Sequence, residues 1–375
     1  MHKIMVILFL LPVNYAYTQT TYYSRVNGNW TDPITWSTTA CGGAAAATAP
    51  GAGDNVIFCE GKTVSLDANS TINNINVNPG AILNIGNKTI TLNGDLVIDG
   101  SILGQNGTFI MNNPSYISGV GTIKSKNNAC FSVNADITFS STDLSIFSDI
   151  NSDIIDIDND VTVTNNGKIT VKGNIVGGNT GSTWINNGTL IIRGDMLTTG
   201  TLKASASGNT INYSGTVSDQ DIKTPADNSY HNLIISGTKI KTQQANLVIN
   251  GNFTINSGTY DCNFFDLNIK GNWTNSTTFI YEDRTVSFDG TSDQTVTSIG
   301  GETFYNLTIN KLSGTLLLND NVTVIETLTM TQGNINTGDN KITVGESKTD
   351  YGTLNYTSGQ VIGKYEKWLT STNHS

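Results

Sequence analysis

Five times the chain repeats one short pattern, in which alternating apolar residues lead into a glycine, an asparagine or aspartate, and another apolar residue. The glycines are Gly94, Gly173, Gly194, Gly251 and Gly271, and their spacings of 79, 21, 57 and 20 residues are close to multiples of 20. Alternation with a period of two is typical of strands. A sequence period near 20 is typical of one strand-and-turn coil of a solenoid. The pattern therefore predicts a stack of short coils.

A longer repeat is superimposed on the first, and the offset between its two copies changes by no more than one position along the sequence. The matching segments are 210–215 with 285–290, 218–220 with 292–294, 230–235 with 304–309, and 246–258 with 321–333. Because the offset holds along the whole matched span, we interpret it as an internal duplication. Each unit is expected to hold about four coils.

These repeats predict an all-β fold, a right-handed parallel β-helix (β-solenoid) with an N-terminal cap. Stacking the coils about 4.8 Å apart would bury the apolar stripe that a single coil leaves exposed. Proline, which cannot donate a ladder hydrogen bond, occurs only 6 times in 375 residues. The handedness follows from the general preference of parallel crossovers. A row of antiparallel sandwiches or propeller blades is the alternative, although sandwich strands recur at about 8–12 residues. The length corresponds to roughly 18 coils.

The N-terminus has the features of a secretory signal peptide, with His2 and Lys3 followed by a short apolar run. That run is too short to span a membrane, so we predict a mature chain without a membrane span, secreted or held on the outer cell surface. The expected organisation is a signal peptide at 1–18, a cap at 19–63, coils at 64–209, repeat units at 210–284 and 285–363, and a C-terminal tail at 364–375.

Export permits disulfides, and Cys41 and Cys59 lie near each other in sequence, in a turn-rich segment where a bridge would close a loop. We predict that they are bonded. Cys130 and Cys262 lie in apolar, strand-like stretches and are expected to be buried free thiols. No cysteine or histidine spacing suggests a zinc site. The tryptophans of the N-terminal segment, Trp30 and Trp36, are predicted to form the core of the cap rather than to stack on carbohydrate.

Several segments resemble large secreted surface proteins of gliding-type bacteria that are exported by the type IX secretion pathway, whose N-terminal parts are similar to the eight-glycine domain. The segments are WTDPITW at 30–36, PGAGDNVIF at 50–58, GKTV at 61–64, the module at 288–333 and GKYEKW at 363–368. The resemblance implies a parallel β-helix, a surface location and an adhesin-like role, and it carries no catalytic motif. Such proteins usually continue past the GKYEKW region into further domains and a C-terminal sorting domain, so we expect either a fragment or a different anchor.

Charge argues against a nucleic-acid partner, because the net charge is −10 and only 13% of residues are charged. A serine-histidine-aspartate triad needs a histidine, and the mature chain has only His231 and His374. His231 is matched by Tyr305 in the duplicated unit, which favours a structural role. A polysaccharide lyase or glycoside hydrolase remains the alternative to a protein without enzymatic activity, and it would require a cleft in which carboxylates, or a carboxylate and a basic residue, converge.

The densest group of carboxylates includes Asp156, Asp158 and Asp160. If this segment were a continuous strand, the three side chains would point to the same side, where an oxygen-rich group suits calcium. We therefore hold two interpretations, a calcium site and a plain acidic outer face, with no other cofactor expected.

The most consistent hypothesis is a secreted structural or adhesin-like rod that presents a polar Thr/Ser/Asn surface to surface glycans or other cell-surface proteins. A glycan-binding module is a further alternative, and it predicts exposed aromatic side chains along one face. Trp184 and Trp273 are the candidates for such contacts.

Overall fold

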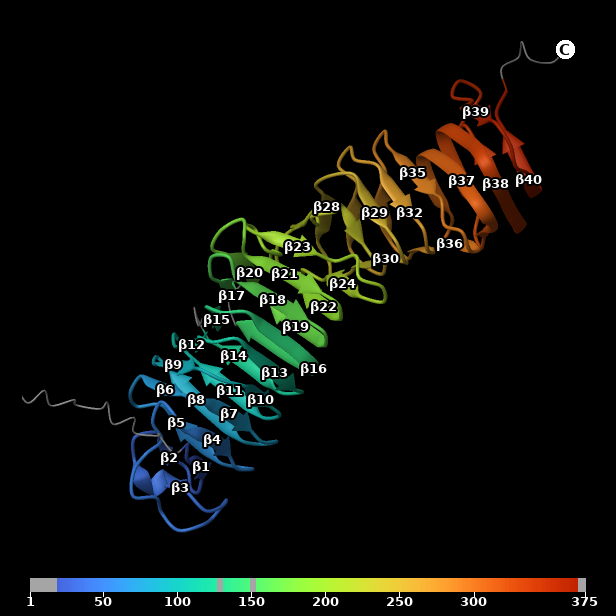
Figure 1. Ribbon diagram of the computed structural model, residues 1–375. Coiled ribbons are helices and arrows are strands. Elements are labelled where there is room, and N and C mark those ends of the chain that lie inside the picture. The colour runs from blue at the N-terminus through green and yellow to red at the C-terminus, as the bar shows by residue number, and fades with distance from the viewer. Residues whose placement is uncertain (1–18, 127–130, 149–152, 370–375) are drawn as a thin grey trace, which may run out of the picture.

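The computed structural model describes residues 19–126, 131–148 and 153–369, so the expected signal peptide, Cys130 and the last residues of the expected tail lie outside the described residues. The chain forms a parallel β-solenoid of about 14 turns, with 55% of its residues in strands. Figure 1 shows the coils stacked into a rod, with β1 near one end and β40 at the other. The predicted fold is confirmed.

Each coil of the rod has three faces, on which strands of successive coils pair in parallel. Face 1 contains β1 (Thr21–Ser24), β4 (Asn55–Phe58), β7 (Asn74–Val77), β10 (Leu96–Ile98), β13 (Ser115–Gly119), the start of β16 (Ile137–Ser148), β18 (Thr162–Asn165), β21 (Thr183–Asn186), β23 (Thr201–Lys203), β26 (Ser229–Tyr230), β29 (Leu247–Ile249), β32 (Leu267–Ile269), β35 (Thr285–Phe288), parts of β37 (Glu302–Leu318) and β38 (Val322–Val344), and β39 (Thr353–Tyr356). Face 2 contains β2 (Gly28–Asn29), β5 (Thr63–Ser65), β8 (Ile82–Gly86), β11 (Ser101–Gly104), β14 (Thr122–Ser125), the end of β16, β19 (Lys168–Lys172), β22 (Thr189–Ile192), β24 (Thr210–Tyr213), β27 (Asn232–Ile235), β30 (Phe253–Ile255), β33 (Trp273–Asn275), β36 (Gln294–Ser298), further parts of β37 and β38, and the start of β40 (Val361–Lys367).

Face 3 contains two separate sheets and continues towards the C-terminal end in parts of β37, β38 and β40, where 302–304 pair with 322–324 and 341–344 pair with 364–367. The first sheet contains β6 (Ser70–Ile72), β9 (Thr89–Leu92), β12 (Thr108–Met111), β15 (Phe131–Val133), β17 (Asp153–Ile157) and β20 (Asn174–Gly177). The second contains β25 (Gln220–Ile222), β28 (Ile240–Gln243), β31 (Thr259–Asp261) and β34 (Thr278–Ile280). At the N-terminal end, β3 (Trp36–Ser37) follows the short 3-10 helix η1 (Pro33–Thr35) and pairs antiparallel with β1.

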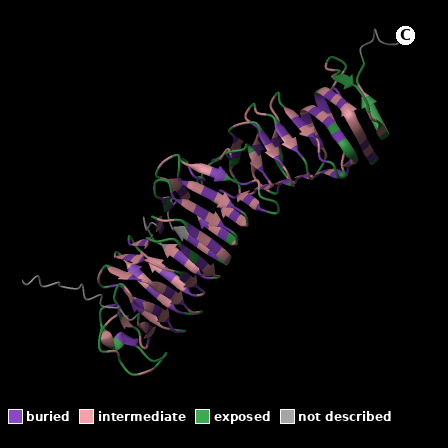
Figure 2. Cartoon of the chain, in the orientation of Figure 1, coloured by how far each residue is buried: buried purple, intermediate pink, exposed green. Residues whose placement is uncertain are grey.

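Stacking places like residues in columns, as the alternating pattern predicts. On face 1, Val56 pairs with Ile75, which pairs with Leu96, which pairs with Ile117, and all four side chains are buried. The inward column removes apolar surface from water along the whole rod. Figure 2 shows the buried and partly buried residues alternating along the strands.

The glycine–asparagine corners have a direct structural cause. At several corners an asparagine side chain accepts a hydrogen bond from the backbone of the coil above, as in Asn252 N–H to Asn232 Oδ1 (2.9 Å) and Asn272 N–H to Asn252 Oδ1 (2.9 Å). A Cβ atom on Gly271 would lie 2.7 Å from Asn252 Oδ1 and 2.2 Å from the carbonyl oxygen of Gly251. Only glycine therefore fits where the corners stack, which explains the recurring motif.

The internal duplication is reproduced in local structure. Buried Gln220 accepts from Gly215 N–H (2.6 Å) and donates to the carbonyl oxygen of Gly194 (2.6 Å). Its counterpart Gln294 accepts from Gly290 N–H (2.9 Å) and donates to the carbonyl oxygen of Gly271. However, β24 lies in face 2 and its counterpart β35 lies in face 1. One repeat unit is therefore less than four full coils, and the second unit is rotated by one face.

The expected number of coils was wrong, since there are about 14 rather than roughly 18. The coils differ in length because loops at the corners extend some of them. Val64 of β5 pairs with Leu83 in the next coil, whereas Thr327 of β38 pairs with Thr353, so the second of these coils is the longer one. The expected boundaries at 63 and 363 fall within strands, because β5 spans the first and β40 spans the second.

Candidate functional site

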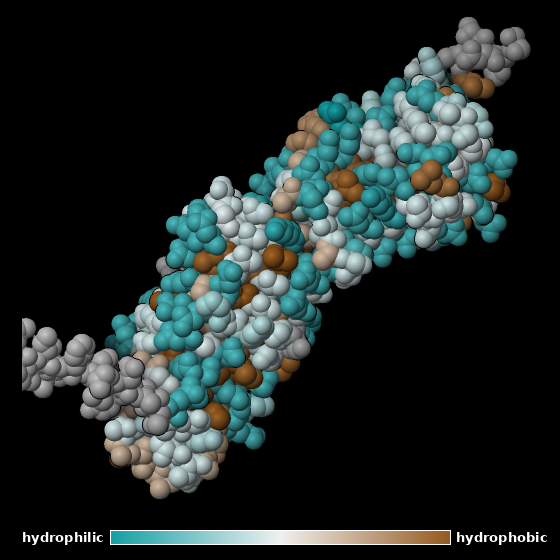
Figure 3. All heavy atoms as spheres, viewed as in Figure 1, coloured by the Kyte–Doolittle hydropathy of each residue, from teal (hydrophilic) through white to brown (hydrophobic). Residues whose placement is uncertain are grey.

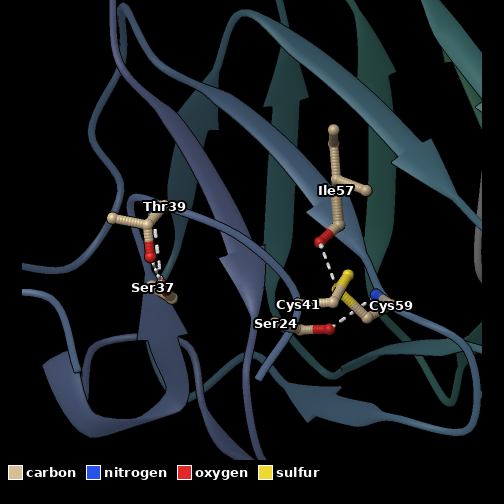
Figure 4. Close-up of a disulfide and its surroundings, with 6 residues drawn as sticks. All are labelled: Ser24, Ser37, Thr39, Cys41, Ile57 and Cys59. Atoms are coloured by element: carbon tan, nitrogen blue, oxygen red, sulfur yellow. Dashed lines mark hydrogen bonds between the residues drawn. A yellow bond between two sulfur atoms is a disulfide. The ribbon is translucent and has the colours of Figure 1, made fainter. Parts of the chain in front are cut away.

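The cap at the N-terminal end is closed by the predicted disulfide. Cys41 and Cys59 are bonded, with their Cα atoms 5.9 Å apart. Figure 4 shows the bridge beside Ser24, whose Oγ accepts a hydrogen bond from the Cys59 N–H at 2.7 Å. The bridge joins the loop before β4 to Cys59, which directly follows β4, and this confirms the pairing predicted from the sequence.

The cap tryptophans are core residues, as predicted. Trp30 and Trp36 are buried and meet edge to face with ring centroids 5.2 Å apart, and Trp36 also packs against Phe58. The Trp36 Nε1–H donates to the Trp30 carbonyl oxygen at 2.8 Å. No face of either ring is open to a sugar, so these residues seal the end of the stack.

The proposed glycan contacts at Trp184 and Trp273 are wrong. Both side chains are fully buried, Trp184 against Phe139 and Trp273 in an aromatic column with Phe253 and Phe304. Each occupies an inward position of its strand, where alternation directs the side chain into the core. The sequence pattern of these strands already carried that information.

The proposed calcium ligands do not share one face. Strand β17 ends at Ile157, so only Asp156 lies in it, while Asp158 and Asp160 belong to the turn that follows. Asp160 has a left-handed backbone (φ 60°) and accepts a hydrogen bond from Asn179 Nδ2 at 3.1 Å. The three side chains are exposed, and no group of three or more metal-ligating side chains is found among the described residues. The geometry assumed for the calcium hypothesis is therefore incorrect.

His231 and Cys262 both pack within the stack of coils. A Cβ atom on Gly251 would lie 2.6 Å from His231 Nδ1, so this imidazole packs against the corner of the next coil. Cys262 is a buried free thiol, as predicted, and burial raises its pKa to about 12. A thiol with a raised pKa is a poor nucleophile near neutral pH.

Two lysines lie in the core, which the sequence did not indicate. Lys241 Nζ donates to the carbonyl oxygens of Gly215 and Lys239, each at 2.9 Å. Lys311 Nζ donates to the Gly290 carbonyl oxygen at 2.6 Å and to Gln294 Oε1 at 2.7 Å. Burial lowers the pKa of both, that of Lys241 to about 8. These ammonium groups supply hydrogen bonds to buried corner carbonyl oxygens inside the stack, which offsets the cost of burying those polar groups.

A groove of about 440 Å³ opens on face 3 where its two sheets are separate. It is lined by residues of three successive coils, which are Asp195, Met196, Thr198, Asp221, Ile222, Lys223, Thr224 and Gln244. Met196 bridges back to Ile175 of β20, whereas Ile222 belongs to β25, the first strand of the second sheet. We call this feature the junction groove.

Polar groups of the junction groove are partly fixed by hydrogen bonds. Gln244 Nε2 donates to Asp221 Oδ1 at 2.8 Å, which orients that carboxylate. Lys223 is held through its backbone, because its N–H donates to the Tyr213 hydroxyl at 3.0 Å and its carbonyl oxygen accepts from the Tyr230 hydroxyl. Partial burial lowers the pKa of the Lys223 ammonium. No motif in the sequence marks these residues, which come together only through stacking.

The C-terminal coil contains a second, more apolar hollow of about 230 Å³, lined in part by Met330, Leu354, Tyr356 and Tyr365. Leu354 stacks in register on buried Leu328, and Tyr365 stacks on buried Ile342. These side chains occupy core columns at the last described coil, so their exposure follows from position in the stack.

Comparison of the chain with protein-family models, with curated proteins and with solved structures finds no match. Among the described residues, no helix is long and apolar enough to cross a membrane. The assignment of function therefore depends on the fold and on the groove.

Proposed function

We propose that this protein is a secreted, structural or adhesin-like rod at the cell surface, which contacts glycans or other surface proteins. The observation that carries the proposal is the regular outward row of polar side chains. On face 2, Thr254, Thr274 and Thr297 pair in register on successive coils. On face 1, Asn268, Ser287, Thr308 and Thr329 do the same. Such rows repeat hydroxyl and amide groups about every 4.8 Å.

Further features support a surface role. The disulfide of the cap is stable in oxidising compartments. Only 13% of the residues are charged, and the ion pairs described, Lys168–Asp143, Arg284–Asp283 and Lys341–Glu366, are exposed. Figure 3 shows hydrophobic residues as small patches among hydrophilic ones. The resemblance to exported surface proteins adds the proposal of type IX secretion.

Immunolabelling of intact producing cells, with and without brief protease treatment, tests the proposal. We expect labelling of intact cells that protease removes, and retention of the purified rod on surfaces coated with cell-envelope glycans. Detection of the protein only after lysis would contradict a surface role.

A carbohydrate-active enzyme is the second candidate, and the junction groove is the specific observation that favours it. Asp195 and Asp221 lie on neighbouring coils with Lys223 beside them, and paired carboxylates or a carboxylate with a base are what glycan hydrolysis or elimination requires. Incubation with a panel of polysaccharides, followed by assays for new reducing ends and for unsaturated products, tests this candidate. Release of either product, lost in Asp221→Asn, would favour the enzyme over the structural rod.

A further inference from the structure

The junction groove opens where the regular stack is interrupted. On faces 1 and 2 the coils on either side of the junction remain joined, through the Ala204–Tyr230 bridge and through β22, β24 and β27. On face 3, no ladder pairing between Met196 and Ile222 is found among the described strands. Figure 1 shows the axis of the rod changing direction near β24 and β28. A wedge on one face is the expected result when two faces stay paired and the third does not.

The backbone around the groove is strained and held. Leu197, next to the groove residue Met196, has a left-handed backbone (φ 51°) and a fully buried side chain. A left-handed leucine is rare, and residues in such conformations concentrate at functional sites. On the other side, the hydroxyls of Tyr213 and Tyr230 lie 3.0 Å apart in the core and bind both backbone polar groups of Lys223. The groove is thus preformed on a rigid support.

The chemistry of the lining matches a sugar. Asp195 and Asp221 offer carboxylate oxygens that accept hydrogen bonds, and the Gln244 side chain offers its amide oxygen, because its amide nitrogen already donates to Asp221 and to the Thr242 carbonyl oxygen. Lys223 offers ammonium donors, and Thr198 and Thr224 offer hydroxyls. Met196 and Ile222 form the buried apolar floor beneath these polar groups. The volume of about 440 Å³ lies within the range of small-molecule sites, about 300–1,000 Å³.

The charge of the groove selects among sugars. The lining holds two carboxylates and one ammonium group, and the whole chain has a net charge of −10. An acidic polysaccharide such as a polyuronate would meet this field unfavourably. A neutral glycan pays no such electrostatic cost and can still bond to the carboxylates, the Lys223 ammonium group and the threonine hydroxyls.

We infer that the junction groove is a binding site for a short segment of a neutral glycan, held by Asp195, Asp221, Lys223 and Gln244. This inference rests on the proposed glycan-contacting function and assigns that function to one place on the rod.

The test is binding of the purified chain to an array of neutral oligosaccharides built from glucose, mannose, xylose and N-acetylglucosamine, with polygalacturonate and alginate as acidic controls. The wild type is expected to bind at least one neutral oligosaccharide. Asp195→Asn, Asp221→Asn and Lys223→Met are each expected to weaken that binding about tenfold, because each removes a charge-assisted hydrogen bond. Asp261→Asn is the matched control, since Asp261 lies in the same outward row as Asp221, two coils along, outside the groove. Thermal unfolding of each variant confirms that the fold is intact.

Three results would overturn the inference. The groove variants bind as tightly as wild type, which would leave a glycan-contacting rod whose contacts lie elsewhere. Polygalacturonate or alginate binds more tightly than every neutral probe, which would exclude the neutral class. The third result is that no neutral probe binds at all. Immunolabelling uses no glycan, so it still reports separately on the proposed surface role.

Discussion

Replacing Gly271 by alanine adds one carbon atom at a corner and so tests how closely the corners of successive coils stack. The new Cβ would lie 2.2 Å from the Gly251 carbonyl oxygen and 2.4 Å from its carbonyl carbon, both backbone atoms of the coil below. That coil is held by hydrogen bonds on both sides, as in Gly251 N–H to the His231 carbonyl oxygen at 2.7 Å, and cannot move freely. Overpacking of this kind costs about 1–3 kcal/mol. The neighbouring bond from Asn272 N–H to Asn252 Oδ1 would weaken by about 1 kcal/mol more.

The loss of chain entropy in the unfolded state offsets about 0.4–1 kcal/mol of this cost, so the net destabilisation is about 1–3 kcal/mol. Urea unfolding followed by circular dichroism measures it. Gly51→Ala is the control, because its Cβ meets only Asp54 Oδ2, at 3.7 Å, and its φ is not left-handed. If Gly271→Ala unfolds at the same urea concentration as Gly51→Ala, the coils do not approach each other as described.

Other predictions concern the cap and the buried charges. Replacing both Cys41 and Cys59 by serine frees a loop of 18 residues and should lower the free energy of unfolding of the cap by about 3 kcal/mol. The fluorescence of the cap tryptophans should then report exposure of their side chains at a lower urea concentration than in the wild type. Equal urea midpoints would show that the bridge does not constrain the cap. The pKa of Lys241 is lowered from 10.5 to about 8, so the unfolded chain binds a proton that the folded chain has released, and stability should rise by about 2 kcal/mol between about pH 8 and pH 9.5. Lys241→Met should lose this rise, and an unchanged pH dependence would refute the assignment. Burial raises the pKa of Glu302 above 4.5, so its contribution to stability is largest at acidic pH and falls as the pH increases through the raised pKa. Glu302→Gln should remove this loss of stability with increasing pH, whereas Glu326→Gln, the control at an exposed position, should keep it.

The fold was predictable because its signals are local. Alternation sets which side chains point into the core. Gly94, Gly194 and Gly271 each mark a corner where an asparagine side chain of the coil below lies so close that a Cβ atom would not fit. The disulfide was predictable because Cys41 and Cys59 lie close in sequence within a segment of turns. Each of these depends on a few neighbouring residues and one regular stacking rule.

The candidate site was not predictable, because it depends on how coils of unequal length meet. Strands β23 and β24 separate Asp195 from Asp221 in sequence, and only the interruption of face 3 places the two carboxylates in one groove. The glycan hypothesis for Trp184 and Trp273 relied on residue type and overlooked their inward positions in the strands. The calcium hypothesis relied on alternation beyond Ile157, where the strand has already ended.

The central claim is that windings distant in sequence stack at a fixed rise, and one distance tests it. Thr170 and Thr297 lie in the same outward row of face 2, six coil-to-coil steps apart. With Cys130 and Cys262 replaced by alanine, spin labels at Thr170→Cys and Thr297→Cys should give a narrow distance distribution centred at about 29 Å by pulsed electron paramagnetic resonance. A broad distribution centred far beyond that value would mean that the chain folds as separate units on a string, and the account would be wrong.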